Sequence, residues 1–346
     1  VLTVEKRMGF GDAGVVGNSA SEINSAVETI TLELIQTAAE RIASYIKRTP
    51  LCRDETLSDR FGSNFYLKYE SLQNTGAFKV RGAFNKMLTL TAEETVRGVV
   101  AVSAGNHAQA VAYAAKTLGL RALILMPEST PKNYLKQTIQ YGAEVETYAN
   151  ISAAFDAADC YALAGMTFIH PFEDADIVAG QGTIGLEILE DLPQVTDVIV
   201  SIGGGGLSGG VAASLKLSKP DVNVWGVETA GAASMAASLD ANEIVELSEI
   251  TSIAKTLGAP RVGELNFKLA KKYLSGVTVV SDEEAVDELL YLLDRSKVLV
   301  EPATSCTLAA AERLQAKFGP DSHVVIILCG GNIGLRDLFK LRSTNW

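Results

Sequence analysis

The stretch Asp197–Leu217, DVIVSIGGGGLSGGVAASLKL, decides the fold because it joins two periodicities through four consecutive glycines. The β-branched run Asp197–Ile202 predicts a buried strand, and the Ala-rich run Leu207–Leu217 predicts a helix. Consecutive glycines are entropically unfavourable. We therefore expect Gly203–Gly206, called the glycine loop below, to approach a phosphate and turn backbone N–H groups toward it. A strand, a glycine loop and a helix in this order indicate an α/β protein.

The same alternation continues along most of the chain. A helix over Leu32–Ile46 ends before Thr49-Pro50, because the residue before a proline disfavours helical geometry. Such alternation is typical of a parallel sheet covered on both faces. The other predicted strands are Gly98–Val102, Ala122–Met126, Val222–Val227 and His323–Leu328, and the other predicted helices are Val80–Leu88, His107–Leu118, Lys132–Tyr141, Thr183–Leu192 and Ala303–Ala316.

Composition and charge limit the class of protein. The 346 residues suffice for one large domain or two moderate ones, and 47% hydrophobic with 21% charged residues is the balance of a globular chain. A net charge of -11 argues against nucleic acid as a partner, since nothing would neutralise its phosphates. We expect Val1–Thr29 to be a loosely ordered N-terminal arm, with neither a signal peptide nor a membrane span.

The cysteines and histidines are too scattered to form an evident site. No CxxC pair occurs, so the spacing predicts neither a disulfide framework nor a zinc site. Unpaired cysteines fit a cytoplasmic, reducing compartment. The four cysteines are Cys52, Cys160, Cys306 and Cys329.

Three further motifs can carry chemistry. Asn74–Lys79 is a turn that leads into a predicted helix, and a lysine at a helix start opposes the macrodipole. Lys79 is either a solvated surface charge or a Schiff-base lysine activated by burial. Ser103–His107 and Cys329–Asn332 each follow a predicted strand, where free N–H groups can bind an anion. Each of these two motifs is also compatible with an ordinary tight turn.

Taken together and in their order along the chain, the four motifs Asn74–Lys79, Ser103–His107, Gly203–Gly206 and Cys329–Asn332 resemble those of fold type II (the β-family) of pyridoxal-phosphate enzymes. Within this fold type the resemblance is to the threonine/serine dehydratases and serine racemases. The resemblance runs from about Thr49 to Leu335 and takes in Ala179–Thr183 and Val300–Ala303. It implies a homo-oligomer with a small amino acid as substrate.

The resemblance also implies a division of the chain. A large parallel-sheet domain, residues 30–97 and 172–346, is interrupted by a smaller α/β domain, residues 98–171, after the arm 1–29. Pyridoxal 5'-phosphate is expected in the cleft between the two domains.

The resemblance assigns roles position by position. Lys79 matches the lysine that holds the cofactor as a Schiff base and removes the Cα proton. Phe78 is expected beside the cofactor, and Asn106 at its 3-hydroxyl. Cys329 stands where the family usually has a serine against the pyridine nitrogen, and its thiol is a weaker hydrogen-bonding group. The phosphate is assigned to Gly203, Gly204, Gly205, Gly206 and Leu207, and the substrate carboxylate to Ser103, Ala104, Gly105, Asn106 and His107.

The implied activity is β-elimination from a β-hydroxy amino acid, L-threonine or L-serine first, which releases a 2-oxo acid and ammonia. Alternatives are 3-hydroxyaspartate and β-phenylserine as substrates. Racemases of the family use a serine as second base where this chain has Ala104, so little racemisation is expected. Relatives that accept dicarboxylic ligands carry an arginine at the position of Phe155, which favours threonine.

A divalent cation is uncertain. Metal-binding relatives resemble this chain at Glu228, whereas their second acidic ligand falls on Ser234.

Three other functions fit part of the sequence. A cysteine synthase-like β-replacement transferase shares the scaffold. A nicotinamide-dependent oxidoreductase fits the glycine loop and Glu228, which lies 22 residues after Gly206, because a Rossmann fold carries an acidic residue about 20 residues further on. A non-catalytic amino-acid sensor would bind the substrate without releasing ammonia.

Overall fold

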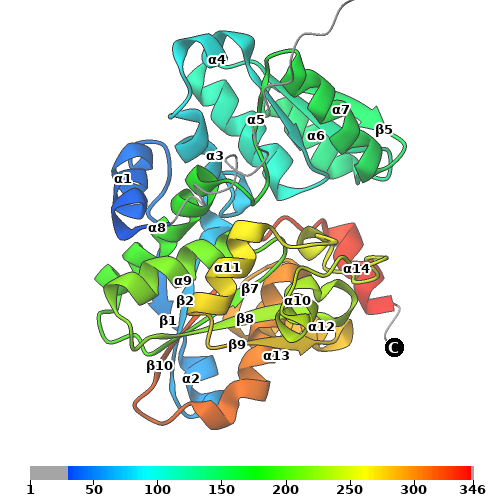
Figure 1. The fold of residues 1–346 in the computed structure, drawn as a ribbon. Coiled ribbons are helices and arrows are strands. Elements are labelled where there is room, and N and C mark those ends of the chain that lie inside the picture. Colours follow the sequence, from blue (N-terminus) through cyan, green and yellow to red (C-terminus); the bar gives the residue numbers. More distant parts are fainter. Residues whose placement is uncertain (1–29, 344–346) are drawn as a thin grey trace, which may run out of the picture.

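The structure, a computed structural model, describes residues 30–343, and two sheets organise them (Figure 1). The larger sheet has the order β1 (Leu51–Arg53), β2 (Asn64–Lys68), β10 (His323–Ile327), β7 (Asp197–Ser201), β8 (Asn223–Thr229) and β9 (Gly276–Val280). The smaller has the order β5 (Glu144–Tyr148), β4 (Ala122–Pro127), β3 (Val99–Val102) and β6 (Thr167–Phe168). Only β1 and β2 pair antiparallel among these strands. The predicted α/β class is therefore confirmed, while the predicted arm Val1–Thr29 lies outside the described residues.

Helices cover both sheets and join them. The α-helices are α1 (Leu32–Ile42), α2 (Glu55–Phe61), α3 (Val80–Met87), α4 (Ala92–Arg97), α5 (Asn106–Leu118), α6 (Lys132–Gln140), α7 (Ile151–Leu163), α8 (Ala175–Asp191), α9 (Gly206–Ser218), α10 (Ser234–Ala241), α11 (Glu264–Tyr273), α12 (Asp282–Tyr291), α13 (Pro302–Leu314) and α14 (Leu335–Ser343). Figure 1 shows α3 and α8 between the smaller sheet, at the top, and the larger sheet below.

The larger sheet is buried on both faces, as its β-branched strands predict. Successive residues of a strand point to opposite sides. Val198 and Val200 of β7 pack in a cluster with α1, α8 and α9, whereas Ile199 packs in a second cluster with α2, α12 and α13. All of these valines and isoleucines are fully buried.

The smaller sheet follows the same rule. Val99 and Ala101 of β3 pack with α3 and α5, and Val100 and Val102 pack with α7. Because α3 precedes residue 98, the core around the smaller sheet extends beyond the segment assigned to the smaller domain. The domain boundaries at 98 and 171 therefore stay a prediction.

A buried ion cluster fixes the start of α3. The Arg81 guanidinium lies 2.8 Å from Oε1 of Glu70 and 2.7 Å from Oε1 of Glu187, and Nζ of Lys68 lies 2.5 Å from Oε2 of Glu187. Removing one partner would leave an unpaired buried charge, which costs about 3–5 kcal/mol. The cluster thus holds the backbone two residues after Lys79.

Two predicted absences can be compared with the described residues. All four cysteines are unpaired, with Cys52 and Cys160 exposed and Cys306 and Cys329 buried, so no disulfide framework forms. Across residues 30–343, no helix combines the length and the apolar character that a membrane crossing requires.

Candidate active site

Two glycine-containing loops leave the same edge of the larger sheet. Strands β7 and β10 are parallel neighbours, with Val324 opposite Asp197. The glycine loop follows β7 and the loop Cys329–Asn332 follows β10, so both lie at carboxyl ends of adjacent strands. This edge is the favoured ligand position in an open parallel sheet.

The lysine motif is bound to the second of these loops. The Phe78 N–H donates to the Cys329 carbonyl at 3.0 Å, and the Gly331 N–H donates to the Gly76 carbonyl at 3.0 Å. Ala77 and Gly330 form an isolated antiparallel bridge between these two bonds. Lys79 is thereby placed at the N-terminus of α3, beside the loop that carries Cys329.

The Lys79 amine is buried between a carbonyl oxygen and an aromatic ring. Its Nζ donates to the Pro171 carbonyl at 2.6 Å and lies 5.2 Å from the centre of the Phe78 ring. Burial lowers the pKa of Lys79 to about 8, against a smaller opposing effect of Cys329. A larger fraction of the amine is therefore neutral near pH 7 than for an exposed lysine, which suits a nucleophile or general base.

Asn106 connects the smaller sheet to this edge. It begins α5, and its Nδ2 donates to Oε1 of Glu301 at 2.8 Å. Its Oδ1 accepts from Nδ2 of Asn332 at 2.8 Å, and the same Asn332 nitrogen donates to the Thr75 carbonyl at 2.7 Å. These bonds bring the Ser103–His107 motif into contact with the Asn74–Lys79 motif and the Cys329–Asn332 motif.

The rest of the Ser103–His107 motif is arranged differently. The Ser103 hydroxyl accepts from the Gly105 N–H at 3.1 Å, and Ala104 is partly exposed. Nε2 of His107 lies 2.9 Å from the Ile169 carbonyl, and burial lowers the pKa of His107 to about 3. The imidazole is therefore a neutral core group that donates to Ile169. Since the imidazole is bound to Ile169, only the backbone N–H of His107 is still predicted to bind a substrate carboxylate.

The glycine loop is closely packed. A Cβ atom on Gly204 would lie 2.2 Å from the Phe172 ring, and a Cβ atom on Gly205 would lie 2.6 Å from Cβ of Asn266. Gly205 also has φ +92°, a conformation that L side chains rarely adopt. Nδ2 of Asn266 donates to the carbonyls of Phe172 and Gly204 at 2.9 Å each. Helix α9 starts at Gly206, so its first N–H groups have no partner within the helix.

Cys329 is surrounded by hydroxyl groups. The Ser201 hydroxyl donates to its Sγ at 3.4 Å, and Oγ1 of Thr304 lies 3.1 Å from the same sulfur. Burial raises the pKa of the Cys329 thiol to about 12. The thiol is therefore neutral at physiological pH and carries no charge toward a ligand.

The arrangement fits pyridoxal phosphate. An amine of lowered pKa suits its aldehyde, an N-terminal helix turn with no room for side chains suits its phosphate, and a neutral thiol suits its pyridine nitrogen. In addition, Oε2 of Glu301 is buried and has no hydrogen-bond partner. We observe these groups together on the loops after β3, β7 and β10 and at the start of α3.

At Glu228, the candidate ligand of a divalent cation, the carboxylate is held by backbone N–H groups. Its two carboxylate oxygens accept from the N–H groups of Met235 and Ala236 at 2.8 Å each, at the start of α10. The Ser234 hydroxyl donates to the Ala259 carbonyl at 3.2 Å. Within residues 30–343, no group of three or more acidic, His or Cys side chains could hold a metal ion. The oxidoreductase interpretation also loses its ribose ligand, because Glu228 is enclosed by α10.

Phe155 does not select the substrate in the way its sequence position suggested. Its half-buried ring packs edge-on against Phe168 with centroids 6.2 Å apart, against the core between α7 and the smaller sheet. Arg81 is not available to a dicarboxylic substrate either, because Glu70 and Glu187 enclose it. The preference for threonine therefore loses the support that Phe155 gave it.

Several residues of the site came from segments that the motifs did not include. Pro171 and Phe172 follow β6, Asn266 lies on α11, and Thr256 donates to Oε1 of Glu301 at 3.0 Å. Glu301 belongs to the segment Val300–Ala303, which supports the resemblance but implies no role for its carboxylate. The glutamate directly before Pro302, at the start of a helix, is the one sequence signal that could have singled it out.

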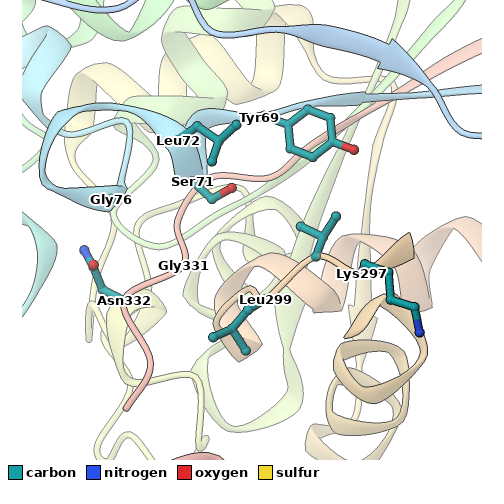
Figure 2. Close-up of a pocket in the computed structure, with 9 residues that line it drawn as sticks. Tyr69, Ser71, Leu72, Gly76, Lys297, Leu299, Gly331 and Asn332 are labelled. Atoms are coloured by element: carbon teal, nitrogen blue, oxygen red, sulfur yellow. The ribbon is translucent and has the colours of Figure 1, made fainter. Parts of the chain in front are cut away.

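A cavity of about 430 Å³ adjoins the same loops from the outside (Figure 2). Gly76, Gly331 and Asn332 line it, together with Tyr69, Ser71, Leu72, Lys297, Val298 and Leu299. Lys79 and the glycine loop are not among its lining residues, so the cavity lies beside the candidate site.

Comparisons with known proteins agree with this geometry. The chain is 43% identical over 315 residues to L-threonine ammonia-lyase of Thermotoga maritima, which covers 90% of this chain and 78% of that enzyme. It is 37% identical over 317 residues to the L-threonine dehydratase catabolic TdcB of Escherichia coli strain K12, covering 88% and 94%. The structure of maize serine racemase superposes with a TM-score of 0.86 at 34% identity, covering 91% of this chain and 98% of that one.

The resemblance to fold type II and to its threonine dehydratase and serine racemase group is thereby confirmed. The family model described as "Pyridoxal-phosphate dependent enzyme" matches residues 42–330. Since this match spans most of the chain, the protein belongs to the family of pyridoxal-phosphate dependent enzymes.

Proposed function

We propose that the protein is an ammonia-lyase that converts L-threonine, and more slowly L-serine, to the 2-oxo acid and ammonia. The observation that carries the proposal is the Lys79 amine, which burial keeps partly neutral between the Cys329 loop and Pro171. The names of the L-threonine ammonia-lyase and the L-threonine dehydratase above support the choice of threonine.

The residues of the site divide the work. Lys79 would hold the cofactor, Phe78 would lie beside it, and the N–H groups of the glycine loop and Leu207 would bind the phosphate. Bound pyridoxal phosphate supplies an electron sink that acidifies the substrate Cα–H bond. The backbone N–H groups of Ser103–His107 would bind the substrate carboxylate at the start of α5, where the helix dipole favours an anion.

Proton transfer belongs to Lys79. Freed when the substrate amine replaces it on the cofactor, the Lys79 amine would take the Cα proton, and a proton equivalent to this one would leave with the β-hydroxyl as water. The resulting enamine tautomerises to an imine, which water hydrolyses to the 2-oxo acid and ammonia. The neutral Cys329 thiol favours this outcome over transamination, because it cannot stabilise a protonated pyridine nitrogen as a carboxylate would.

Ammonia release from a panel of amino acids tests the proposal. The panel contains L-threonine, L-serine, L-threo- and L-erythro-3-hydroxyaspartate and L-β-phenylserine, with the D-isomers as controls. We expect the highest kcat/KM with L-threonine. A higher value with a 3-hydroxyaspartate or with β-phenylserine would assign a different substrate, and no ammonia from any of them would contradict the proposed reaction.

Racemisation is the second activity to measure, because a serine racemase is among the similar structures. Inversion requires a second base on the other side of the substrate, and the methyl group of Ala104 cannot return a proton. We expect L-serine to give pyruvate and almost no D-serine, and Ala104→Ser to raise the D-serine fraction. Substantial D-serine from the unmodified enzyme, measured by chiral chromatography, would mean that another group acts as the second base.

The proposed setting is a cytoplasmic homo-oligomer. Four unpaired cysteines, two of them exposed, support a reducing compartment. The resemblance to the dehydratase group supports oligomers of this chain, and analytical ultracentrifugation of the holoenzyme tests their size.

A further inference from the structure

A buried carboxylate lies among the motifs without a part in the proposed reaction. Glu301 is 4% exposed and directly precedes α13. Its backbone N–H donates to the Gly330 carbonyl at 3.2 Å, and Pro302 follows it. The main chain therefore holds Glu301 against the loop that carries Cys329.

The Glu301 side chain is only partly satisfied. Its Oε1 accepts from Nδ2 of Asn106 at 2.8 Å and from the Thr256 hydroxyl at 3.0 Å. Its Oε2 is buried without a hydrogen-bond partner within bonding distance, and burial raises the pKa of the carboxyl against the smaller lowering effect of the nearby Asn332 backbone N–H. No ion pair among residues 30–343 includes Glu301. Burying such a carboxylate is unfavourable, and buried ionisable groups of this kind cluster at functional sites, which indicates a function for Glu301.

That function concerns the orientation of the Asn106 amide. The Thr75 carbonyl can only accept, so the atom of Asn332 that contacts it is the nitrogen, and this nitrogen then donates to Oδ1 of Asn106. The Glu301 carboxylate also only accepts when ionised, so Nδ2 of Asn106 must face it. The Thr75 carbonyl and the Glu301 carboxylate, at the two ends of this series of hydrogen bonds, thus fix the orientation of both side-chain amides between them. One N–H of Asn106 remains for a ligand.

We propose that Glu301 is a positioning residue that fixes the Asn106 amide, so that its remaining N–H faces the 3-hydroxyl oxygen of bound pyridoxal phosphate. This inference rests on the proposed function, in which Asn106 contacts that oxygen. If the amide turned by 180°, Oδ1 would face the cofactor oxygen and repel it. Glu301 therefore acts on cofactor binding and on the protonation of that oxygen through Asn106.

The groups that face Glu301 allow a clear pH readout. Cys329 follows β10, Tyr134 lies on α6 and Cys306 on α13, and burial raises the pKa of each of these groups. They stay neutral between pH 6 and 9. Burial also raises the pKa of Glu301, to about 7, so its charge changes within this range.

The experiment compares holoenzymes of the unmodified chain, Glu301→Gln, Asn106→Ala and the double variant. Glu288→Gln is the matched control, because Glu288 is 6% exposed but pairs with Arg60 on α2. The measurements are the cofactor Kd, the visible absorbance spectrum from pH 6 to 9, and kcat and KM. Reduction with borohydride and peptide mapping of Lys79 are done on each holoenzyme.

We expect Glu301→Gln to weaken cofactor binding about tenfold, the size of one hydrogen bond to a charged group, and to remove the spectral transition near pH 7. Asn106→Ala should give the same changes, and the double variant should be no worse than either single one. Glu288→Gln should leave spectrum and Kd unchanged. Thermal unfolding of each variant checks folding, and Thr256→Val, which removes the other donor to Oε1, provides a milder substitution with a smaller shift in the same direction.

Three results would overturn the inference: an unchanged spectrum and Kd in Glu301→Gln, additive losses in the double variant, or a spectral change of equal size in Glu288→Gln. Failure of the proposed function is a separate result. In that case the unmodified enzyme would release no ammonia, or its Lys79 would carry no cofactor after reduction.

Discussion

A lysine at a helix start is electrostatically unfavourable, and at Lys79 this has a chemical use. The positive end of α3, burial and the Phe78 ring all surround an amine that donates only to the Pro171 carbonyl. Burial and the helix end favour the neutral amine, whereas the Phe78 ring and the Pro171 carbonyl favour the ammonium form. Burial has the larger effect and lowers the pKa of Lys79 to about 8. The two other lysines near this segment are paired: Lys68 with Glu187, and Lys86 with Asp174 and Asp176.

Covalent attachment should therefore be confined to Lys79. After borohydride reduction of the holoenzyme, peptide mapping should place the cofactor on the peptide with Lys79 and not on those with Lys68 or Lys86. Lys79→Ala should lower kcat by a factor of about 10² to 10⁴, the range for a positioned acid–base group. Lys86→Ala is the matched control and should retain the rate. A labelled Lys68 or Lys86 peptide would contradict the assignment.

At the scale of residues, the sequence motifs predicted which residues lie in the turns between strands and helices. The glycine loop, Lys79, Asn106 and Cys329 lie together because each follows or precedes a predictable strand or helix. The motifs could not predict side-chain direction. His107 is turned toward Ile169 and Phe155 toward Phe168, because one turn of a helix presents both a core face and a ligand face. Thr256 and Asn266 lie too far along the chain for any spacing to connect them with the motifs.

At the scale of elements, glycines allow close packing in two different ways. Helix α8 was predicted to start at Thr183, but it starts at Ala175 and contains Gly180 and Gly182. A Cβ atom on Gly180 would lie 2.7 Å from Cα of Gly82, and one on Gly182 would lie 2.9 Å from the Gly210 carbonyl. Gly180 and Gly182 therefore allow α3 and α9 to approach α8. From the sequence alone, the same two glycines suggest that the helix begins only after them, at Thr183.

In the glycine loop, by contrast, a Cβ atom would collide with the side chains of Phe172 and Asn266, and not with another backbone. The Phe172 contact can be tested by substitution. Gly204→Ala places a methyl group on the Phe172 ring, and overpacking of this kind costs about 1–3 kcal/mol. We expect cofactor binding to weaken by about tenfold or more. Adding Phe172→Ala should restore part of the affinity by removing the obstacle. Equilibrium dialysis gives the Kd values.

Gly319→Ala is the matched control for this series, because no atom lies within 4 Å of the Cβ that it would gain. Its cofactor Kd should equal that of the unmodified chain. If Gly204→Ala also kept its full affinity, the phosphate would have to bind elsewhere.

The junction of β8 and α10 leads to a prediction about metal ions. Two N–H groups at the start of α10 satisfy Glu228, so we expect chelators to leave activity unchanged. Ser234→Asp adds a second carboxylate next to Glu228, and two carboxylates without a cation repel each other. The variant should unfold at a lower temperature than the unmodified chain, and Mg²⁺ or Ca²⁺ should raise that temperature in the variant alone.

Ser234→Asn has the same shape without the charge and serves as its control, with no response to either ion. Activity of the unmodified enzyme that EDTA abolishes and Mg²⁺ or Ca²⁺ restores would contradict the prediction.

At the scale of the whole molecule, buried groups of opposite kinds set how stability depends on pH. Burial and the charge of Lys79 lower the pKa of His107 from 6.5 to about 3 and that of His170 from 6.5 to about 4. Burial raises the pKa of Glu228 and of Glu301 from 4.5 to about 7. As pH falls, the histidines weaken the native state because the unfolded chain binds their protons first. The carboxyls have the opposite effect, because the native state binds theirs first.

Between about pH 4.5 and 6.5 these contributions oppose one another, so replacing one histidine should expose its share. His107→Gln can keep a donor to the Ile169 carbonyl but cannot titrate. The His107 contribution is fully present above pH 6.5 and is lost as pH falls toward 3. The free energy of unfolding of His107→Gln, minus that of the unmodified chain, should therefore rise by about 1.4 kcal/mol for each pH unit below 6.5. Urea unfolding of the cofactor-free proteins measures this difference.

From pH 7 to 8 the difference in the free energy of unfolding should be constant, which is the internal control. A difference that also stays constant down to pH 5 would mean that His107 is protonated as readily in the native enzyme as in the unfolded chain.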